Sequence, residues 1–279
     1  ISQEEELIKK ITAKITVLST GGAGSLYAHT TNPEIATGDG LGSAYRARVL
    51  MDGLPYIQFH PTALYPKING HTFLITEAVR GAGGKLLNTQ GERFMLKNDL
   101  KAELATRDIV ARGIQSEIKN QKEGFVWLDG SRIDKKQWET HFPTILETCS
   151  SLGIDLPKDP IPVVPAAHYF CGGIKVNKRS ESELKGLYAI GECSATGLHG
   201  SNRLASNSLL ESLVFAQRAA QDSLSALQEN LPNESFYAAI PEWDGDAYSN
   251  STEIKSIKNL REQLQELMTK YVGIFKTNN

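Results

Sequence analysis

The clearest pattern of apolar and polar positions lies in the second half of the chain. Apolar residues recur there at helical spacing, at Leu209, Leu210, Leu213, Val214, Ala216, Ala219 and Ala220. This periodicity predicts an amphipathic helix, for which Ser206, Asn207 and Ser208 are suitable N-cap residues. A second apolar stripe predicts a helix over residues 252–271, through Ile254, Ile257, Leu260, Leu264, Leu267 and Met268.

Strand, turn and helix signals alternate through the rest of the chain. β-Branched residues dominate residues 11–20 and Gly21-Gly22 follows, which predicts a strand ended by a turn. The other expected elements are strands at 125–129 and 187–190, helices at 41–49 and 138–152, a hairpin at 88–94 with its turn at Gln90-Gly91, and a helix capped by Thr106.

A proline-rich run is typical of a crossing between domains, and it consists of Pro157, Pro160, Pro162 and Pro165. Strand and glycine signals like those near the start of the chain return after it. We therefore expect an α/β domain built from residues 1–55 and 168–238, interrupted by an α+β capping domain over residues 56–167.

Composition and charge narrow the class of protein. The 279 residues are enough for one large or two modest domains, and the net charge of −2 gives no reason to expect a nucleic-acid surface. No apolar run is long enough to span a bilayer, and no signal peptide is visible. Cys149, Cys171 and Cys193 are too few and too scattered for a disulfide framework or a metal site, and they fit a reducing, cytoplasmic compartment.

Two glycine-containing turns near the start are candidate ligand sites. The turn Thr20 to Gly24 begins like a dinucleotide fingerprint, but counting from Gly22 the third glycine position is Tyr27. The turn is then either a place where the backbone at Gly22 approaches a ligand or an ordinary tight turn. Asp39, between two glycines, is a suitable cap for the helix that follows.

The stretch from His199 to Glu211 combines a polar loop with the start of the amphipathic helix. A helix N-terminus presents unpaired N–H groups and a partial positive charge, which suit an anion or an electron-rich heterocycle. Arg203, just upstream, carries a planar fork suited to a carboxylate. A few of these residues would describe an ordinary capped helix. The whole stretch resembles the signature of the succinate dehydrogenase / fumarate reductase flavoprotein family, most closely its L-aspartate oxidase branch.

The resemblance extends over about residues 11–274 by motif matching and implies FAD as the cofactor. The matched positions near FAD are Gly22, Asp39, Glu192, Asn207, Ser208 and Leu209. Residues 239–279 resemble the start of the family's C-terminal helical domain, and the family's N-terminal ADP-binding segment is not found. Because Ile1 is also not an initiator Met, we expect a fragment of a longer protein.

The resemblance also implies two clamps for a dicarboxylate. His60 and Thr76 would bind one carboxylate, and His168 and Arg203 the other. The structural alternatives are that His60, which precedes Pro61, and His168 are ordinary hydrogen-bonded histidines.

Three further charged residues have open alternatives. Glu77 and Arg80 are three residues apart, so they form either a surface ion pair or, by resemblance, part of a proton path. Arg107 in the first turn of a helix is unfavourable for the helix dipole. By resemblance it is the catalytic proton-transfer residue. Because an arginine stays protonated in proteins, the milder interpretation is electrostatic stabilisation by a permanent cation.

The function that the resemblance implies is FAD-dependent oxidation of L-aspartate to iminoaspartate, with oxygen or fumarate as the electron acceptor. This would be the first step of de novo NAD biosynthesis through quinolinate, with quinolinate synthase as a functional partner. The alternatives are the flavoprotein subunit of a fumarate reductase or succinate dehydrogenase, and a fragment that is colourless and inactive on its own. The residue that would recognise the amino group is not identifiable in the sequence.

Overall fold

The computed structural model describes residues 10–68, 72–228, 235, 238–241 and 251–276, with the backbone alone for 251–255. Ile254 belongs to the predicted apolar stripe, but its side chain lies outside the described part of the chain. The predicted domain ranges also include residues outside it, at 1–9, 69–71, 229–234, 236–237, 242–250 and 277–279. The chain divides into two compact units. Unit 1 contains residues 1–22, 38–56 and 171–263, and unit 2 contains residues 23–37, 57–170 and 264–279.

The chain passes between the units at five places, after Gly22, Thr37, Tyr56, Phe170 and Gln263. Residues 23–37 belong by their contacts to unit 2, although the sequence grouped them with the α/β domain. The assignment of the units as an FAD-binding and a capping domain stays a prediction.

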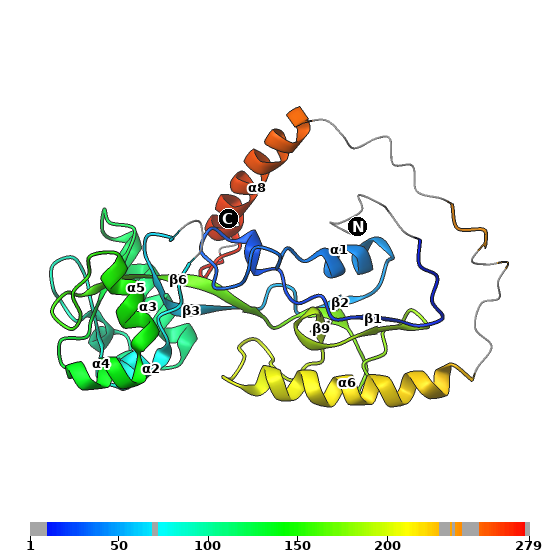
Figure 1. The fold of residues 1–279 in the computed structure, drawn as a ribbon, viewed down its shortest axis with the longest axis horizontal. Coiled ribbons are helices and arrows are strands. Elements are labelled where there is room, and N and C mark those ends of the chain that lie inside the picture. The colour runs from blue at the N-terminus through cyan, green and yellow to red at the C-terminus, as the bar shows by residue number, and fades with distance from the viewer. Residues whose placement is uncertain (1–9, 69–71, 229–234, 236–237, 242–250, 277–279) are drawn as a thin grey trace. The chain divides into compact units, whose positions relative to one another are not determined.

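Unit 1 contains two small sheets (Figure 1). In the first, β1 (Thr16–Leu18) runs parallel to β8 (Leu187–Ala189). In the second, β7 (Gly173–Lys175) pairs antiparallel with β2 (Met51–Asp52) and parallel with β9 (Ser194–Ala195). The strands predicted at 11–20 and 187–190 are therefore present, but each has only three residues.

Three helical elements complete the part of unit 1 that positions candidate residues. They are α1 (Asp39–Arg46), the 3-10 helix η4 (Gly191–Cys193) and α6 (Asn207–Ala226). The helix predicted at 41–49 begins earlier than expected, because Gly38 occupies the N-cap with φ of +77°. Asp39 is therefore not the cap. It lies in the first turn, where a carboxylate is favourable for the helix dipole.

Unit 2 is built on one four-stranded antiparallel sheet. Its spatial order is β3 (Ile57–Leu64), β6 (Ile161–Phe170), β5 (Val126–Asp129) and β4 (Lys85–Leu87). The helical elements of the unit are η1 (Gly24–Leu26), α2 (Glu77–Gly81), η2 (Phe94–Lys97), η3 (Ala102–Leu104), α3 (Arg107–Lys119), α4 (Lys135–His141) and α5 (Pro143–Ser151). The hydrophobic core lies in this unit and includes Leu64, Ile75, Leu86, Ile114 and Trp138, all fully buried.

The last part of α8 (Ser251–Tyr271), from residue 264, belongs to unit 2. Its side chains reach the segment around η1: Gln265 donates to the Ser25 carbonyl at 2.8 Å, and the Ala28 N–H donates to Thr269 Oγ1 at 2.9 Å. The buried Tyr27 hydroxyl donates to the Val272 carbonyl at 3.1 Å. The helix predicted at 252–271 is confirmed almost to the residue.

The proline-rich run is not the crossing between the units that was expected, because residues 57–170 all belong to unit 2. Pro162 and Pro165 lie inside β6. Proline is tolerated in a strand where its missing N–H is not needed, as at a bulge. The ladder between β3 and β6 shifts register next to Pro165, and Pro162 still contributes its carbonyl, which accepts from the Tyr65 N–H at 2.9 Å.

Two other predicted elements differ from the structure. The helix expected over 138–152 is two helices, because Pro143 lacks an N–H donor and begins α5 after the break at Phe142. The turn expected at Gln90-Gly91 is present, with Gly91 at φ of +80°. Residues 92–97, all described, form no second strand, so the hairpin was wrong: the chain enters η2 instead.

Candidate active site

Two histidines of unit 2 lie on neighbouring strands of its sheet. His60 is on β3 and His168 is on β6, and the ladder pairs His60 with Ala166. A residue two places along the partner strand lies diagonally on the same face. The two imidazole rings accordingly lie 5.3 Å apart between centroids, at 61° to each other. The structure thus brings together two of the predicted substrate-binding residues.

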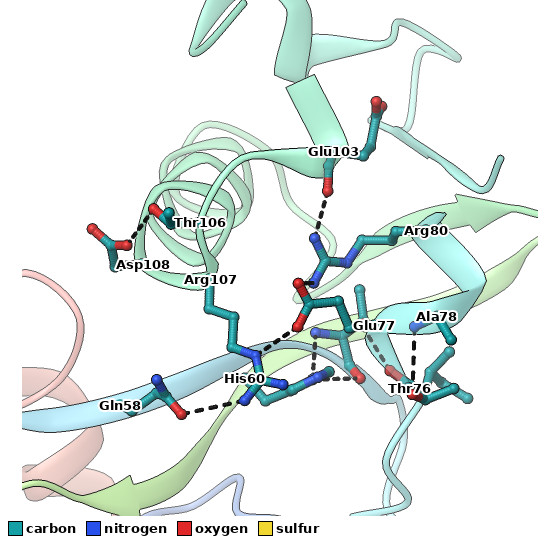
Figure 2. Close-up of polar contacts among 12 residues, drawn as sticks. Gln58, His60, Thr76, Glu77, Ala78, Arg80, Glu103, Thr106, Arg107 and Asp108 are labelled. Carbon is teal, nitrogen blue, oxygen red and sulfur yellow. Dashed lines mark hydrogen bonds and ion pairs between the residues drawn. The ribbon is translucent and has the colours of Figure 1, made fainter. Parts of the chain in front are cut away.

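Arg107 reaches the same region from the first residue of α3. Its Nε donates to Glu77 Oε2 at 2.7 Å, and its Nη1 donates to Gln58 Oε1 at 3.3 Å (Figure 2). Gln58 is on β3, two residues before His60, and is buried. Thr106 occupies the N-cap of α3 as predicted, but its hydroxyl donates to Asp108 Oδ1 and makes no capping bond.

Glu77 lies between two arginines. Its Oε1 is 3.9 Å from Arg80 Nη2, and its Oε2 bonds to Arg107. The Arg80 side chain is 1% exposed while that of Glu77 is 45% exposed, so the pair is not an ordinary surface ion pair. Arg80 Nη1 donates to the Glu103 carbonyl at 2.5 Å. Its Nε and Nη2 are buried without a hydrogen-bond partner in the part of the chain described. Burial lowers the pKa of Arg80, and Glu77 acts against that shift.

Burial first, and the surrounding charges after it, decide the protonation of His60. Burial, followed by His168, Arg107 and Arg80, holds the pKa of His60 well below its ordinary value. The Thr62 N–H donates to its Nδ1 at 3.2 Å. His60 is therefore a neutral imidazole in a region that carries two guanidinium cations. Such a region is suited to an anionic ligand.

Thr76 is the N-cap of α2, and its hydroxyl oxygen accepts from the Ala78 N–H at 3.4 Å. The preceding residue is tied to β3, because the Thr62 hydroxyl donates to the Ile75 carbonyl at 2.8 Å. Figure 2 shows Thr76, His60, Glu77 and Arg107 in one close-up. Four of the five residues expected to bind or act on a dicarboxylate therefore belong to unit 2, and Arg203 belongs to unit 1.

In unit 1 the carboxyl ends of the parallel strands β1 and β8 lead into two glycine turns. Gly21 has φ of +71° and Gly191 has φ of +67°. A Cβ added to Gly22 would lie 2.4 Å from Glu192 Oε1, and one added to Gly40 would lie 2.0 Å from Thr20 Oγ1. Nucleotides bind outside the carboxyl ends of parallel strands in α/β folds. Gly22 thus lies close to Glu192, and Gly40 of α1, next to Asp39, lies close to Thr20. These close approaches at the edge of the sheet fit the binding of a nucleotide cofactor there.

The α6 helix begins at Asn207, close to this edge. A Cβ on Gly191 would lie 3.3 Å from the Ser212 hydroxyl, so the helix packs against η4 through small side chains. Ser206 occupies the N-cap with φ of +67° and makes no side-chain capping bond, so the expected hydroxyl cap is absent among these described residues. Arg203 is buried, and its Nη1 donates to the Ser208 hydroxyl at 3.2 Å, whereas Leu209 is 72% exposed.

The first and last residues of the signature stretch bond to each other. His199 Nε2 lies 2.7 Å from Glu211 Oε2, and both side chains are almost fully buried. The Thr196 hydroxyl donates to the other carboxylate oxygen of Glu211. The loop that carries Arg203 is thereby fastened to the second turn of α6.

The three cysteines are free and buried. Burial raises the pKa of Cys149 to about 11 and also raises those of Cys171 and Cys193. These raised pKa values keep the groups as packed thiols at neutral pH, which gives no reason to assign a nucleophile among them.

Among the described residues, none of the helices has both the length and the apolar character that crossing a bilayer requires.

Three residues without a predicted role lie beside the predicted ones. Gln58 holds Arg107, Thr31 bonds to His168, and Glu103 is a buried acid whose carbonyl accepts from Arg80. Gln58 was visible as part of the motif around His60. Thr31 is separated from His168 by more than a hundred residues, so no local signal connects them.

Comparison with known proteins adds the family. A model of the FAD binding domain matches residues 2–209. The chain belongs to this family of FAD-binding domains. FAD is accordingly the cofactor, and the expected FAD-binding α/β fold class is confirmed. The close approach of Gly22 to Glu192 at the sheet edge is consistent with FAD binding in unit 1.

Curated relatives of this FAD-binding chain include L-aspartate oxidases. L-aspartate oxidase 1 of Ralstonia nicotianae is 48% identical over 271 residues, covering 97% of this chain and 50% of that protein. L-aspartate oxidase of Acinetobacter baylyi is 47% identical over 279 residues, covering 99% of this chain and 50% of that protein. The chain spans about half the length of the curated relatives it matches.

Solved structures similar to this FAD-binding chain include fumarate reductases. E. coli quinol fumarate reductase superimposes with a TM-score of 0.81 at 33% identity, over 94% of this chain and 48% of that chain. A quinol-fumarate reductase with menaquinol molecules gives a TM-score of 0.79 at 34% identity, over 93% of this chain and 48% of that chain.

Proposed function

We propose that the protein containing this chain oxidises L-aspartate to iminoaspartate, with FAD as cofactor and oxygen or fumarate as the final electron acceptor. The observation that carries the proposal is the cluster of His60, His168 and Arg107 in unit 2, in which the rings of the two histidines lie 5.3 Å apart and Arg107 faces His60. The identity to L-aspartate oxidases over nearly the whole chain supports the substrate.

We propose that two pairs of side chains bind the two carboxylates of the substrate. His60 and Thr76 bind one of them, and His168 and Arg203 bind the other. A neutral imidazole still offers one N–H donor, and Arg203 offers a charged fork. Two fixed carboxylates orient the bond to be oxidised, which is a positioning effect.

Arg107 is proposed as the residue that stabilises or transfers charge at the reacting atoms. Its Nε bond to Glu77 and its Nη1 bond to Gln58 hold the guanidinium in one orientation. Glu77 links it to the buried Arg80, so a proton given up by Arg107 toward fumarate can be replaced along this chain of groups. Toward aspartate, a permanent cation acts by electrostatic stabilisation.

The groups proposed to hold the cofactor belong to unit 1. They are Gly22, Asp39, Glu192, Asn207, Ser208 and Leu209. The backbone at Gly22 and the N-terminus of α6 provide N–H groups of the kind that bind nucleotide cofactors. FAD, when bound, supplies the two-electron redox chemistry. Iminoaspartate is a precursor of quinolinate, so we propose quinolinate synthase as the enzyme that uses the product.

A second candidate is supported by the structural similarity to fumarate reductases, because the same carboxylate clamps serve succinate and fumarate. The deciding experiment is an assay of the full-length protein, loaded with FAD, for hydrogen peroxide with L-aspartate and separately with succinate. We expect peroxide with L-aspartate and little with succinate. Oxidation of succinate alone would establish the second candidate, and no reaction with either substrate would contradict both.

A variant arm of the same assay tests the role of Arg107. Arg107→Leu is expected to lower kcat with L-aspartate by about 10²-fold or more, the size of a lost acid–base or charge-stabilising group. Arg112→Leu is the matched control, since Arg112 is on the same helix and forms an exposed pair with Asp108. Equal rates in the two variants would remove Arg107 from the mechanism.

A further inference from the structure

Residues 29–32 of unit 2 run beside the strand that carries His168. The Ala167 N–H donates to the His29 carbonyl at 2.9 Å, and the Thr31 N–H donates back to the Ala167 carbonyl at 3.0 Å. Thr30 and Ala167 form a parallel bridge. These backbone bonds fix the short segment against β6, so its side chains have a defined position relative to His168.

Two side chains of this segment bond to His168 itself. The Thr31 hydroxyl lies 2.7 Å from the imidazole Nδ1, and Asn32 Nδ2 donates to the His168 carbonyl at 3.2 Å. The first bond concerns the ring and the second the backbone. Together they fix both the ring and the backbone of His168, which is proposed to bind a substrate carboxylate.

The direction of the Thr31–His168 bond follows from the neighbouring carbonyl. The Ala167 carbonyl already accepts the Thr31 N–H and the Thr30 hydroxyl, each at 3.0 Å. A carbonyl has two lone pairs, so these two donors satisfy it. The Thr31 hydroxyl is 3.5 Å from the same oxygen, at the limit of a hydrogen bond. Its proton is therefore directed to His168 Nδ1, the closer acceptor.

We propose that Thr31 is a positioning residue that holds neutral His168 with its proton on Nε2. A neutral imidazole carries one proton, and when Nδ1 accepts a hydrogen bond the proton lies on the other nitrogen. The ring then offers an N–H donor, which a carboxylate can accept. The opposite tautomer would present a lone pair to that carboxylate and repel it. The meaning of the tautomer for substrate binding rests on the proposed function, whereas the tautomer itself does not.

The test is the tautomeric state of His168 in the chain labelled with ¹⁵N-histidine. Long-range ¹H–¹⁵N correlation spectra distinguish the two neutral tautomers, and they are recorded well above the ordinary imidazole pKa of about 6.5. The signals of His168 are assigned by their disappearance in His168→Gln. We expect the Nε2–H form to dominate. Dominance of the Nδ1–H form would overturn the proposal without any variant of Thr31.

Variants of Thr31 then test the cause. Thr31→Val, which keeps the shape and removes the hydroxyl, should lower the ratio of the Nε2–H to the Nδ1–H form by about fivefold, the factor given by one neutral hydrogen bond. Thr31→Ser should restore the ratio. The matched control is Thr37→Val, since Thr37 lies in the stretch 23–37 of the same unit and its hydroxyl donates to the Ile35 carbonyl. An unchanged ratio in folded Thr31→Val, or an equal change in Thr37→Val, would contradict the role of Thr31.

The spectra are recorded without substrate and do not depend on enzyme activity. Their result can therefore contradict this proposal without contradicting the proposed function, and the reverse is also true. In the full-length enzyme, Thr31→Val should raise the KM for L-aspartate by about fivefold and change kcat little, because one binding donor is weakened. A shifted tautomer with an unchanged KM would leave Thr31 as the residue that orients His168 and would remove His168 from the clamp.

Discussion

At the scale of single residues, the candidate site of unit 2 carries more positive than negative charge. Two guanidinium groups, those of Arg80 and Arg107, share the carboxylate of Glu77. His60 adds no charge, because burial and the nearby cations lower its pKa. These groups together keep a net positive charge, which favours a bound carboxylate.

The lowered pKa of His60 predicts how stability depends on pH. An unfolded histidine has a pKa near about 6.5, so at acid pH the unfolded chain binds a proton that folded His60 does not bind. This contribution lowers the free energy of unfolding as the pH falls through the unfolded pKa, and the loss continues down to the folded pKa. His60→Gln removes it. The variant should therefore lose less Tm than the parent between about pH 8 and about pH 5.

His141→Gln is the control for this measurement, because His141 is exposed on α4 in the same unit. Its Tm should fall with pH as that of the parent does. If His60→Gln falls as steeply as the parent, His60 is not held neutral in the folded chain.

The sequence motifs predicted which residues belong to this cluster, but they did not predict which of these side chains are buried. The three-residue spacing of Glu77 and Arg80 allows a surface pair and a buried one equally well, and only the packing of α2 beneath η3 decides between them. Thr31 shows a second limit. It meets His168 through strand pairing between segments distant in sequence, which a motif within either segment cannot show.

At the scale of elements, the loop before α6 is fastened by one buried carboxylate. Glu211 accepts from Thr196 and bonds to His199, and Arg203 in the same loop bonds to Ser208 in the first turn of α6. These bonds connect the loop rigidly to the start of the helix, which is what a residue proposed to bind a substrate, such as Arg203, needs for a fixed position.

Removing the Glu211 carboxylate should destabilise unit 1. Glu211→Ala leaves the buried His199 ring nitrogen and the half-buried Thr196 hydroxyl without their partner. An unsatisfied buried polar group costs about 1–3 kcal/mol, so we expect the free energy of unfolding to fall by about 3 kcal/mol. Glu211→Gln keeps an acceptor oxygen and should lose less. Urea unfolding followed by circular dichroism measures both.

The control is Glu139→Ala, which removes an exposed partner of Lys135 on α4 and should cost less than about 1 kcal/mol. A loss for Glu211→Ala no larger than for Glu139→Ala would show that the buried network contributes nothing to holding the loop.

Periodicity and capping signals located most helices, and failed where packing or proline decides. The predicted helix after Ser206 is present, yet its buried residues are Glu211 and Ala219, and Leu209 and Leu213 are largely exposed in this chain. Apolar spacing identifies a helix without identifying the face that packs in its unit. Proline signals predicted a domain crossing at 157–165, but β6 runs through Pro162 and Pro165, and its ladder with β3 shifts register next to Pro165.

At the scale of the whole molecule, the proposed functional groups are divided between two compact units. Unit 1 holds the groups assigned to FAD together with Arg203, and unit 2 holds the two histidines and the chain of charged groups from Arg107 to Arg80. The sequence predicted an interrupted domain from the return of strand and glycine signals. It did not predict that residues 23–37 and the end of α8 pack in unit 2, because those contacts join segments more than two hundred residues apart.

The most direct test of the proposed dicarboxylate site is a crystal structure of the full-length protein with oxidised FAD and fumarate. We predict one fumarate carboxylate within hydrogen-bond distance of His60 and Thr76, and the other within hydrogen-bond distance of His168 and Arg203. Arg107 should face the bond between the two central carbons. Fumarate bound away from His60 and His168, or bound there with Arg203 directed elsewhere, would contradict the account.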